Sequence, residues 1–344
     1  MAVTLAAVNS SLGDVRASTS GAPFCASLVA FSSLVAQGTF AKAEASAVEH
    51  LGKRAAQKKR EGSSLLDSEA TSIRRFLLQL VSSPGRLAAA SPTRSVVVKQ
   101  ACKSDGELST LLSAKDLVPL LLPGTEQKER LSFTLEWLQV TSSTKQAAFV
   151  GHLHAQIAAM KDSSKAEEVA HKGKRKGGPK DPAKQKSSME TEVASSAIAF
   201  LSSATTKKGC QLVLLAHFGE LVNACIAHSL PSARKLVVKL AECWLSQGFS
   251  AGIAAKILCA LACGKSGSGV GGGDSDAGVC CAALEALGSA AVLEGLGPTE
   301  SVAAFELVAH CHASRYGAPS VVFSKAGIAE YLLHRLLVIL LLLS

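Results

Sequence analysis

Apolar residues recur every three or four positions along most of this chain, which is the spacing of one face of an α-helix. In the segment SSLLDSEATSIRRFLLQLVSSPG, for example, Ile73, Phe76 and Leu80 share a helical face, and Pro84 follows to end the helix. Similar segments follow one another with Pro or Gly between them, and no stretch of comparable length has the alternating pattern of a strand. The pattern therefore predicts an all-α fold.

The order of helix, short turn and helix is typical of stacked helical hairpins. We expect an N-terminal helical array over residues 23–162 and a C-terminal helical array over residues 189–344. The run GKSGSGVGGGDSDAG at 264–278 predicts a flexible Gly-rich loop within the second array. Residues 1–22 show little contrast between apolar and polar positions, and we expect a mobile N-terminal segment there.

Several helices are predicted from local residues. Pro23 begins an apolar helix that runs to about Val35, and Pro231 begins another that Gly248 ends. The stretch CQLVLLAHFGELVNACIAHSL, residues 210–230, is apolar on nearly all sides. That composition predicts a helix that its neighbours cover from several directions.

A basic stretch rich in Gly and Pro, HKGKRKGGPKDPAKQK, separates the two arrays. Its breakers predict a basic disordered linker over residues 163–188 that joins the two halves. Its closely spaced cations resemble a nuclear-localisation cluster, which an acidic receptor groove recognises. Contact with RNA phosphates and a solvated linker without a binding role are the alternatives. The cations concerned are Lys172, Lys174, Arg175, Lys176 and Lys180.

The net charge of +9 is concentrated before Gly209, because acids slightly outnumber bases in the rest of the chain. Such asymmetry indicates polyanion contact or a targeting signal in the N-terminal half. A secondary basic patch ends one predicted helix, where cations also interact favourably with the helix dipole, so a solvated helix end is the alternative. This secondary basic patch consists of Lys53, Arg54, Lys58, Lys59 and Arg60.

Charged residues make up only 18% of the chain, against about 25% in soluble proteins, so the chain itself or its partners must cover much of its surface. Ala and Leu dominate segments such as AALEALGSAAVLEGL, residues 282–296. This texture resembles the helices of HEAT and armadillo repeats. The resemblance implies an irregular HEAT-like helical-hairpin array, an α-solenoid whose ridged surface holds protein partners.

No catalytic, cofactor or metal site is predicted. The triplet GKS at 264–266 matches the end of a phosphate-binding loop, but Cys259 occupies the position of that loop's first glycine. His310 and His312 lie two residues apart, so on a helix they point to different sides and cannot grip one ion. Acidic residues are scattered singly along the predicted helix surfaces, so an enzyme is not expected.

A membrane-spanning helix needs about 18 to 20 uninterrupted apolar residues. No segment of the chain is that long, so no membrane span is predicted. The C-terminal run LLVILLLL has no polar face, although a terminal helix in a repeat array normally exposes one. We expect this helix to dock on a partner, on another copy of the chain or on missing chain of a longer array. The interface residues predicted there are Leu336, Leu337, Ile339, Leu340 and Leu341.

These patterns predict a non-enzymatic helical-repeat scaffold that mediates protein–protein interactions in an intracellular assembly. The basic cluster favours the nucleus or nucleolus. The N-terminus is rich in Ala and Ser, with Asp14 its only acid before Glu44, which leaves an organelle as the alternative location. The alternative function is an RNA-associated helical factor, for ribosome assembly or organellar RNA, that uses the basic N-terminal half.

Overall fold

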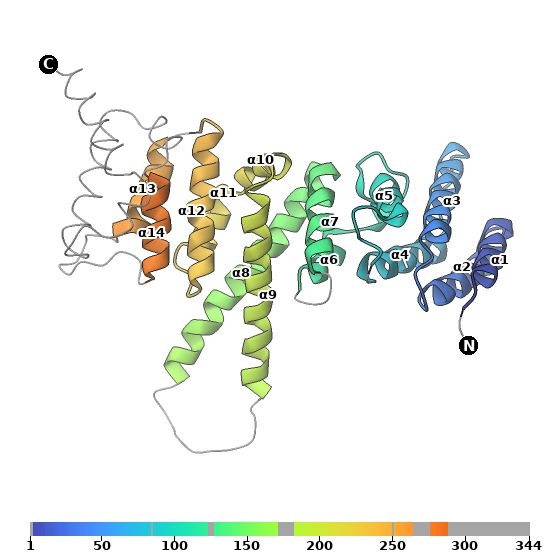
Figure 1. Cartoon of the computed structure of the whole chain (residues 1–344), viewed down its shortest axis with the longest axis horizontal. Coiled ribbons are helices and arrows are strands. Elements are labelled where there is room, and N and C mark those ends of the chain that lie inside the picture. The colour runs from blue at the N-terminus through green and yellow to red at the C-terminus, as the bar shows by residue number, and fades with distance from the viewer. Residues whose placement is uncertain are drawn as a thin grey trace. The chain divides into compact units, whose positions relative to one another are not determined.

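A computed structural model of the chain contains helices and connecting turns, with no strand in the part that it describes (Figure 1). The all-α prediction is confirmed for that part. The described residues are 3–83, 85–122, 127–170, 182–249, 251–263 and 276–287.

The chain divides into two compact units, unit 1 over residues 1–153 and unit 2 over residues 154–344. The division falls inside helix α8 (Ser143–Ala170), before the predicted linker begins. Both α8 and α9 (Pro182–Ala204) extend into residues 163–188, so the predicted linker was too long at each end. The reason is local: SKAEEVA is rich in helix formers, and Pro182 occupies a first helical position that suits proline. Residues 171–181 lie outside the described residues.

Unit 1 is built from helices that pack mainly on near neighbours in the chain, as α1 does on α2, α2 on α4 and α3 on α5. Its core holds fully buried aromatic side chains, among them Phe31 and Phe76, whose ring centroids are 5.7 Å apart. A π-helix, Val98–Cys102, continues directly from α5. The helices are α1 (Leu5–Ala17), α2 (Ala22–Val35), α3 (Ala41–Arg60), α4 (Asp67–Ser82), α5 (Pro92–Val97), α6 (Ala114–Leu117), α7 (Gln127–Val140) and the start of α8.

Helix α1 lies where the sequence predicted a mobile segment over residues 1–22, and that prediction was wrong. The side chain of Thr4 caps the helix by accepting a hydrogen bond from the Ala7 N–H at 3.3 Å. Val8 and Val15 are fully buried and Leu12 is 5% exposed, because α1 packs against α2 and α3. Ala and Ser fill the other positions, so the narrow apolar stripe gave little contrast in the sequence.

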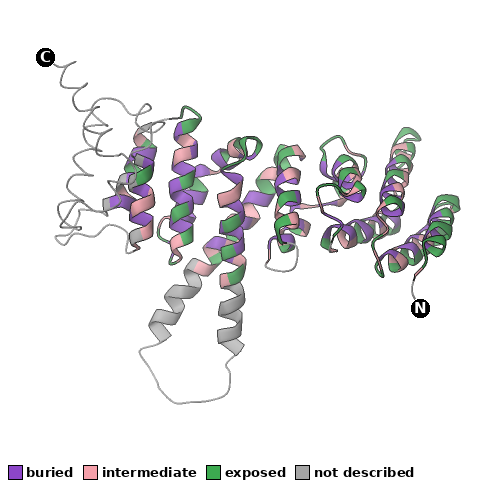
Figure 2. Cartoon of the chain, in the orientation of Figure 1, coloured by how far each residue is buried: buried purple, intermediate pink, exposed green. Residues whose placement is uncertain are grey.

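Unit 2 is organised around α12 (Pro231–Ser246), which packs against α9, α10, α11, α13 and α14. More than half of its 16 residues are buried, as the purple positions along it show (Figure 2). It begins at Pro231 as predicted, and Gly248, with a φ of 76°, follows its end. The other helices are α10 (Lys208–Ala216), α11 (Phe218–Cys225), α13 (Ala251–Cys263) and α14 (Ala277–Leu287).

The apolar stretch 210–230 forms two short helices, α10 and α11, and not the single covered helix that was predicted. The backbone leaves helical geometry at His217, where φ is −111° and ψ is 19°. Among the described helices, α10 packs mainly on α9 and α12, and Leu212 on it is 62% exposed. Local composition shows how many residues are apolar, but it does not show which of them other helices bury.

A buried ion pair joins three parts of unit 1. Arg86 Nε donates to Glu44 Oε1 at 2.8 Å, and the Arg86 guanidinium also donates to the carbonyls of Val35 and Gly38. Thr93 Oγ1 donates to the other oxygen of Glu44 at 3.0 Å. Glu44 is fully buried, so it is not one of the scattered surface acids that the sequence predicted. Its partner lies 42 residues away, which no local pattern reveals.

Candidate binding surfaces

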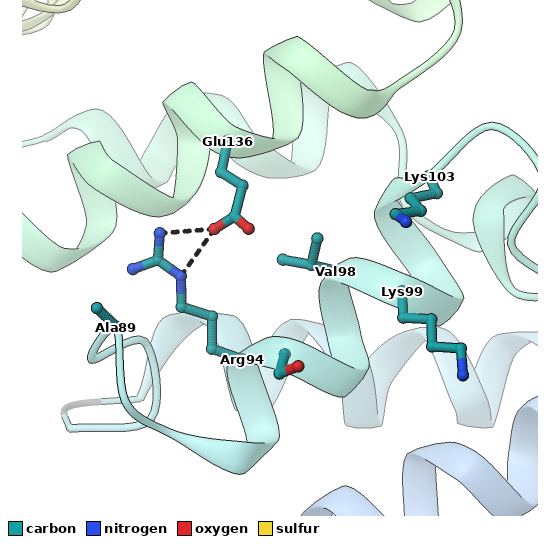
Figure 3. Close-up of a pocket in the computed structure, with 7 residues that line it drawn as sticks. Ala89, Arg94, Val98, Lys99, Lys103 and Glu136 are labelled. Carbon is teal, nitrogen blue, oxygen red and sulfur yellow. Dashed lines mark hydrogen bonds and ion pairs between the residues drawn. The ribbon is translucent and has the colours of Figure 1, made fainter.

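An open groove of about 550 Å³ lies in unit 1 between α5, the π-helix and α7 (Figure 3). Arg94 and Glu136 meet at one end of it, and Lys99 and Lys103 lie at the other. Its apolar lining comes from Ala89 and Val98, and the hydroxyl of Ser95 adds a polar group. Sequence reasoning did not predict this groove, because its two walls come from segments about 40 residues apart.

Arg94 is held in a fixed position in the groove wall. It is 7% exposed, and its Nε and Nη2 atoms both donate to Glu136 Oε2, at 2.9 and 2.7 Å. Its Nη1 donates to the Leu87 carbonyl at 2.8 Å, and its Nη2 also reaches Ser132 Oγ at 3.1 Å. The charges of Arg94 and Glu136 therefore neutralise each other. No described residue donates a hydrogen bond to the second carboxylate oxygen of Glu136, Oε1.

The two lysines of the groove are exposed, and neither has an ion-pair partner among the described residues. Lys99 lies in the π-helix and Lys103 directly follows it, with the Lys103 N–H donating to the Val98 carbonyl at 3.0 Å. The two lysines lie four residues apart in the chain, and both line the groove. The groove thus has a net positive end, whose charge no described residue balances.

Two glycines allow other segments to approach the π-helix closely. A Cβ atom at Gly106 would lie 2.5 Å from the Gln100 carbonyl oxygen and 2.8 Å from that of Lys99. The close approach lets the Leu108 N–H donate to the Gln100 carbonyl at 2.8 Å. A Cβ atom at Gly52 of α3 would instead overlap the amide end of the Gln100 side chain. The π-helix is therefore supported from two sides by contacts that a side chain would obstruct.

We expect Gly106→Ala to lower the unfolding free energy of unit 1 by about 1–3 kcal/mol, because backbone must move to relieve the overlap. Gly52→Ala is the matched control and should cost less than about 1 kcal/mol, since the Gln100 amide can rotate away and alanine favours the helix. Urea unfolding followed by tryptophan fluorescence measures both. Equal losses would show that the backbone contact at Gly106 has no special cost.

The predicted secondary basic patch lies at the C-terminal end of α3. One of its members, Arg54, makes contacts with other segments that hold it against the protein and away from the exposed cations. Arg54 Nη2 donates to Glu69 Oε1 at 2.8 Å, and its guanidinium lies 4.1 Å from the centroid of the Phe24 ring. Arg54 also donates to the carbonyls of Ser18 and Thr19. Its role is therefore to join α3 to α4 and to the turn before α2. Of the other patch residues, Lys53, Lys59 and Arg60 are exposed and Lys58 is half-buried.

Glu69, the partner of Arg54, is fully buried. Burial by itself would raise the pKa of its carboxyl, but the Arg54 side chain and the N–H groups of Gly21 and Leu66 donate hydrogen bonds to it. These bonds outweigh burial and hold the pKa of Glu69 below its usual range. The carboxylate therefore stays charged at neutral pH and holds Arg54 in place.

A second surface feature, which sequence reasoning missed, is a stack of three aromatic rings in unit 2. The ring centroid of Trp244 lies 4.3 Å from that of Phe218 and 4.5 Å from that of Phe249. Phe218 is 6% exposed and Phe249 is 42% exposed, so the stack runs from the core to solvent. We call it the aromatic stack. In the same unit, Gln247 at the end of α12 donates to Gln211 of α10 at 3.0 Å.

The remaining predicted sites lie outside the described residues. They are the basic cluster of the linker, Lys172, Lys174, Arg175, Lys176 and Lys180, and the C-terminal interface, Leu336, Leu337, Ile339, Leu340 and Leu341. Both stay predictions, as does the nuclear or nucleolar location. The Gly-rich loop 264–278 is also outside, apart from its last three residues.

Within the described residues, no helix is both long enough and apolar enough to cross a membrane. The same part of the chain holds no group of three His, Cys, Asp or Glu side chains placed to bind a metal ion. Function must be argued from the residues themselves, because no protein-family model, curated protein or solved structure matches this chain.

Proposed function

We propose that this chain is a non-enzymatic helical scaffold that binds protein partners, built as an irregular HEAT-like array in two halves. The observation that carries the proposal is the aromatic stack, which ends at a Phe249 ring 42% exposed to solvent. Large aromatic side chains held in place by packing are enriched among the residues that dominate protein–protein affinity.

Other exposed apolar side chains of unit 2 support the same proposal. Leu212 is 62% exposed on α10, and the hydrogen bond between Gln211 and Gln247 holds α10 beside the end of α12. Ile253, at the start of α13, is 50% exposed. When a partner covers these side chains, the complex is stabilised by about 25 cal/mol for each Å² of apolar surface removed from water. Because the rings are already stacked, little side-chain entropy is lost on binding.

The cellular setting that we propose is a nuclear or nucleolar assembly. The support is the basic cluster between Lys172 and Lys180, whose composition resembles a localisation signal. Such a signal is read by a transport receptor and needs no contact with either folded unit.

The test replaces Phe249 and Leu212 together by Ser in the full chain and compares the proteins that co-purify from the native source. We expect specific partners to be lost, while circular dichroism and thermal unfolding stay close to wild type, because both side chains are exposed. The matched control replaces Leu5 and Val29, which are 59% and 53% exposed in unit 1, by Ser and should keep those partners. Partners that bind both double variants as well as wild type would contradict the proposal for this surface.

An RNA-associated factor is the second candidate, and the specific observation in its favour is the exposed end of the secondary basic patch. Lys59 and Arg60 are exposed at the end of α3, and neither has an ion-pair partner among the described residues. Binding to bulk RNA would then weaken steeply with salt, and removing both charges would reduce the salt slope by about 2. Negligible salt-dependent binding favours the protein scaffold.

A further inference from the structure

We propose that the groove between the π-helix and α7 binds an acidic segment of a protein partner, with Lys99 and Lys103 pairing with its carboxylates. The inference rests on the proposed scaffold function and deepens it, because it names a second binding site and the chemistry of its ligand. This site lies in unit 1, whereas the aromatic stack lies in unit 2.

Charge is the first argument. Arg94 and Glu136 neutralise each other through two hydrogen bonds of 2.9 and 2.7 Å, so they add little net charge to the groove. Lys99 and Lys103 remain exposed at the groove, and neither has a counter-charge among the described residues. Each ammonium group attracts an arriving carboxylate and keeps three donors for it.

The backbone is the second argument. A π-helix is rare and is found disproportionately at functional sites. Here it carries Lys99 and ends at Cys102, directly before Lys103, and the close approach at Gly106 and the hydrogen bond from Leu108 to Gln100 hold it. The two lysines are thus presented by a supported element, and a binding site on a rigid element is more precise than one on a loop.

The groove suits a peptide better than a nucleic acid. Glu136 Oε1 has no donor among the described residues, so it can accept the backbone N–H of a bound peptide. A chain of phosphates would bring negative charge to that same carboxylate. None of the described residues that line the groove is aromatic, so they offer bases no ring on which to stack, while Ala89 and Val98 provide apolar contact. Its volume of about 550 Å³ lies within the usual range for a ligand site.

The test measures binding of a fluorescein-labelled acidic peptide, alternating Glu and Leu, to the full chain by fluorescence anisotropy. A peptide with Gln in place of Glu is the uncharged probe. Lys99→Gln with Lys103→Gln should weaken binding of the acidic peptide about tenfold, because two ion pairs are lost. Lys207→Gln with Lys208→Gln removes the same charge from exposed positions in unit 2 and should leave the affinity within about twofold.

The outcomes separate the explanations. Equal weakening by the two double variants would show that the peptide responds only to net charge, and the proposal would be overturned. No binding of the acidic peptide to wild type, or equal binding of the Gln peptide, would also overturn it. Tighter groove-dependent binding of poly(U) would assign the site to nucleic acid instead. None of these results alters the partner comparison with the Phe249 and Leu212 variants, so failure of the groove and failure of the scaffold proposal are distinguishable.

Discussion

Replacing Arg86 by Met is expected to lower the unfolding free energy of unit 1 by about 3–5 kcal/mol, because it leaves the Glu44 carboxylate buried without its cation. The side chain of Glu44 is fully buried and that of Arg86 is 5% exposed, so water cannot replace the lost partner. Arg86 also donates to the carbonyls of Val35 and Gly38 at the end of α2, and these groups lose a donor as well. A loss of this size is a large part of the stability of an ordinary domain.

The chain offers a direct measurement, because its two tryptophans lie one in each unit, Trp137 in unit 1 and Trp244 in unit 2. With Trp244 replaced by Phe, urea unfolding followed by fluorescence reports unit 1 alone. The matched control is Arg74→Met, which breaks the pair with Asp116 at 2.6 Å. Because the Arg74 side chain is 49% exposed, we expect a loss of about 1 kcal/mol or less.

A double variant tests the physical reason. If the cost comes from an unpaired buried charge, Glu44→Leu with Arg86→Met should recover part of the stability that Arg86→Met loses. Similar losses for Arg86→Met and Arg74→Met, or a double variant worse than the sum of its parts, would contradict the explanation.

The second large effect is expected for Trp137→Ala, which should lower the unfolding free energy of unit 1 by about 3–5 kcal/mol. Trp137 is fully buried, and its ring centroid lies 5.3 Å from that of Phe149, so the side chain packs α7 against α8. Thermal or urea unfolding followed by circular dichroism measures the loss. Phe249→Ala is the control, with an expected cost of about 1 kcal/mol or less, because that ring is 42% exposed.

Trp137→Phe separates packing from hydrogen bonding. The indole Nε1 of Trp137 is buried and has no hydrogen-bond partner in the described part of the chain. Replacing the indole by a phenyl ring therefore removes no hydrogen bond and keeps much of the apolar contact. We expect a loss clearly smaller than that of Trp137→Ala. Equal losses would show that the shape of the indole, and not its bulk, determines the packing.

The sequence by itself determined the helical class and many helix boundaries. The helices α2, α4 and α12 were predicted from apolar spacing together with Pro or Gly at their ends. These signals are local: a proline at the first helical position or a glycine after the last one acts through its own backbone geometry. They therefore remain readable without any knowledge of what the helix packs against.

The tertiary structure alone decided which polar groups are buried and which surfaces are built. Glu44 and Glu69 read as ordinary helix-surface acids until Arg86 and Arg54 are brought to them. Helix α1 is fixed by packing on α2 and α3, since its own sequence has little apolar contrast. The groove likewise forms only when α7 carries Glu136 to Arg94. The physical reason is common to all of these: burial and ion pairing depend on residues distant in the chain, so local spacing cannot encode them.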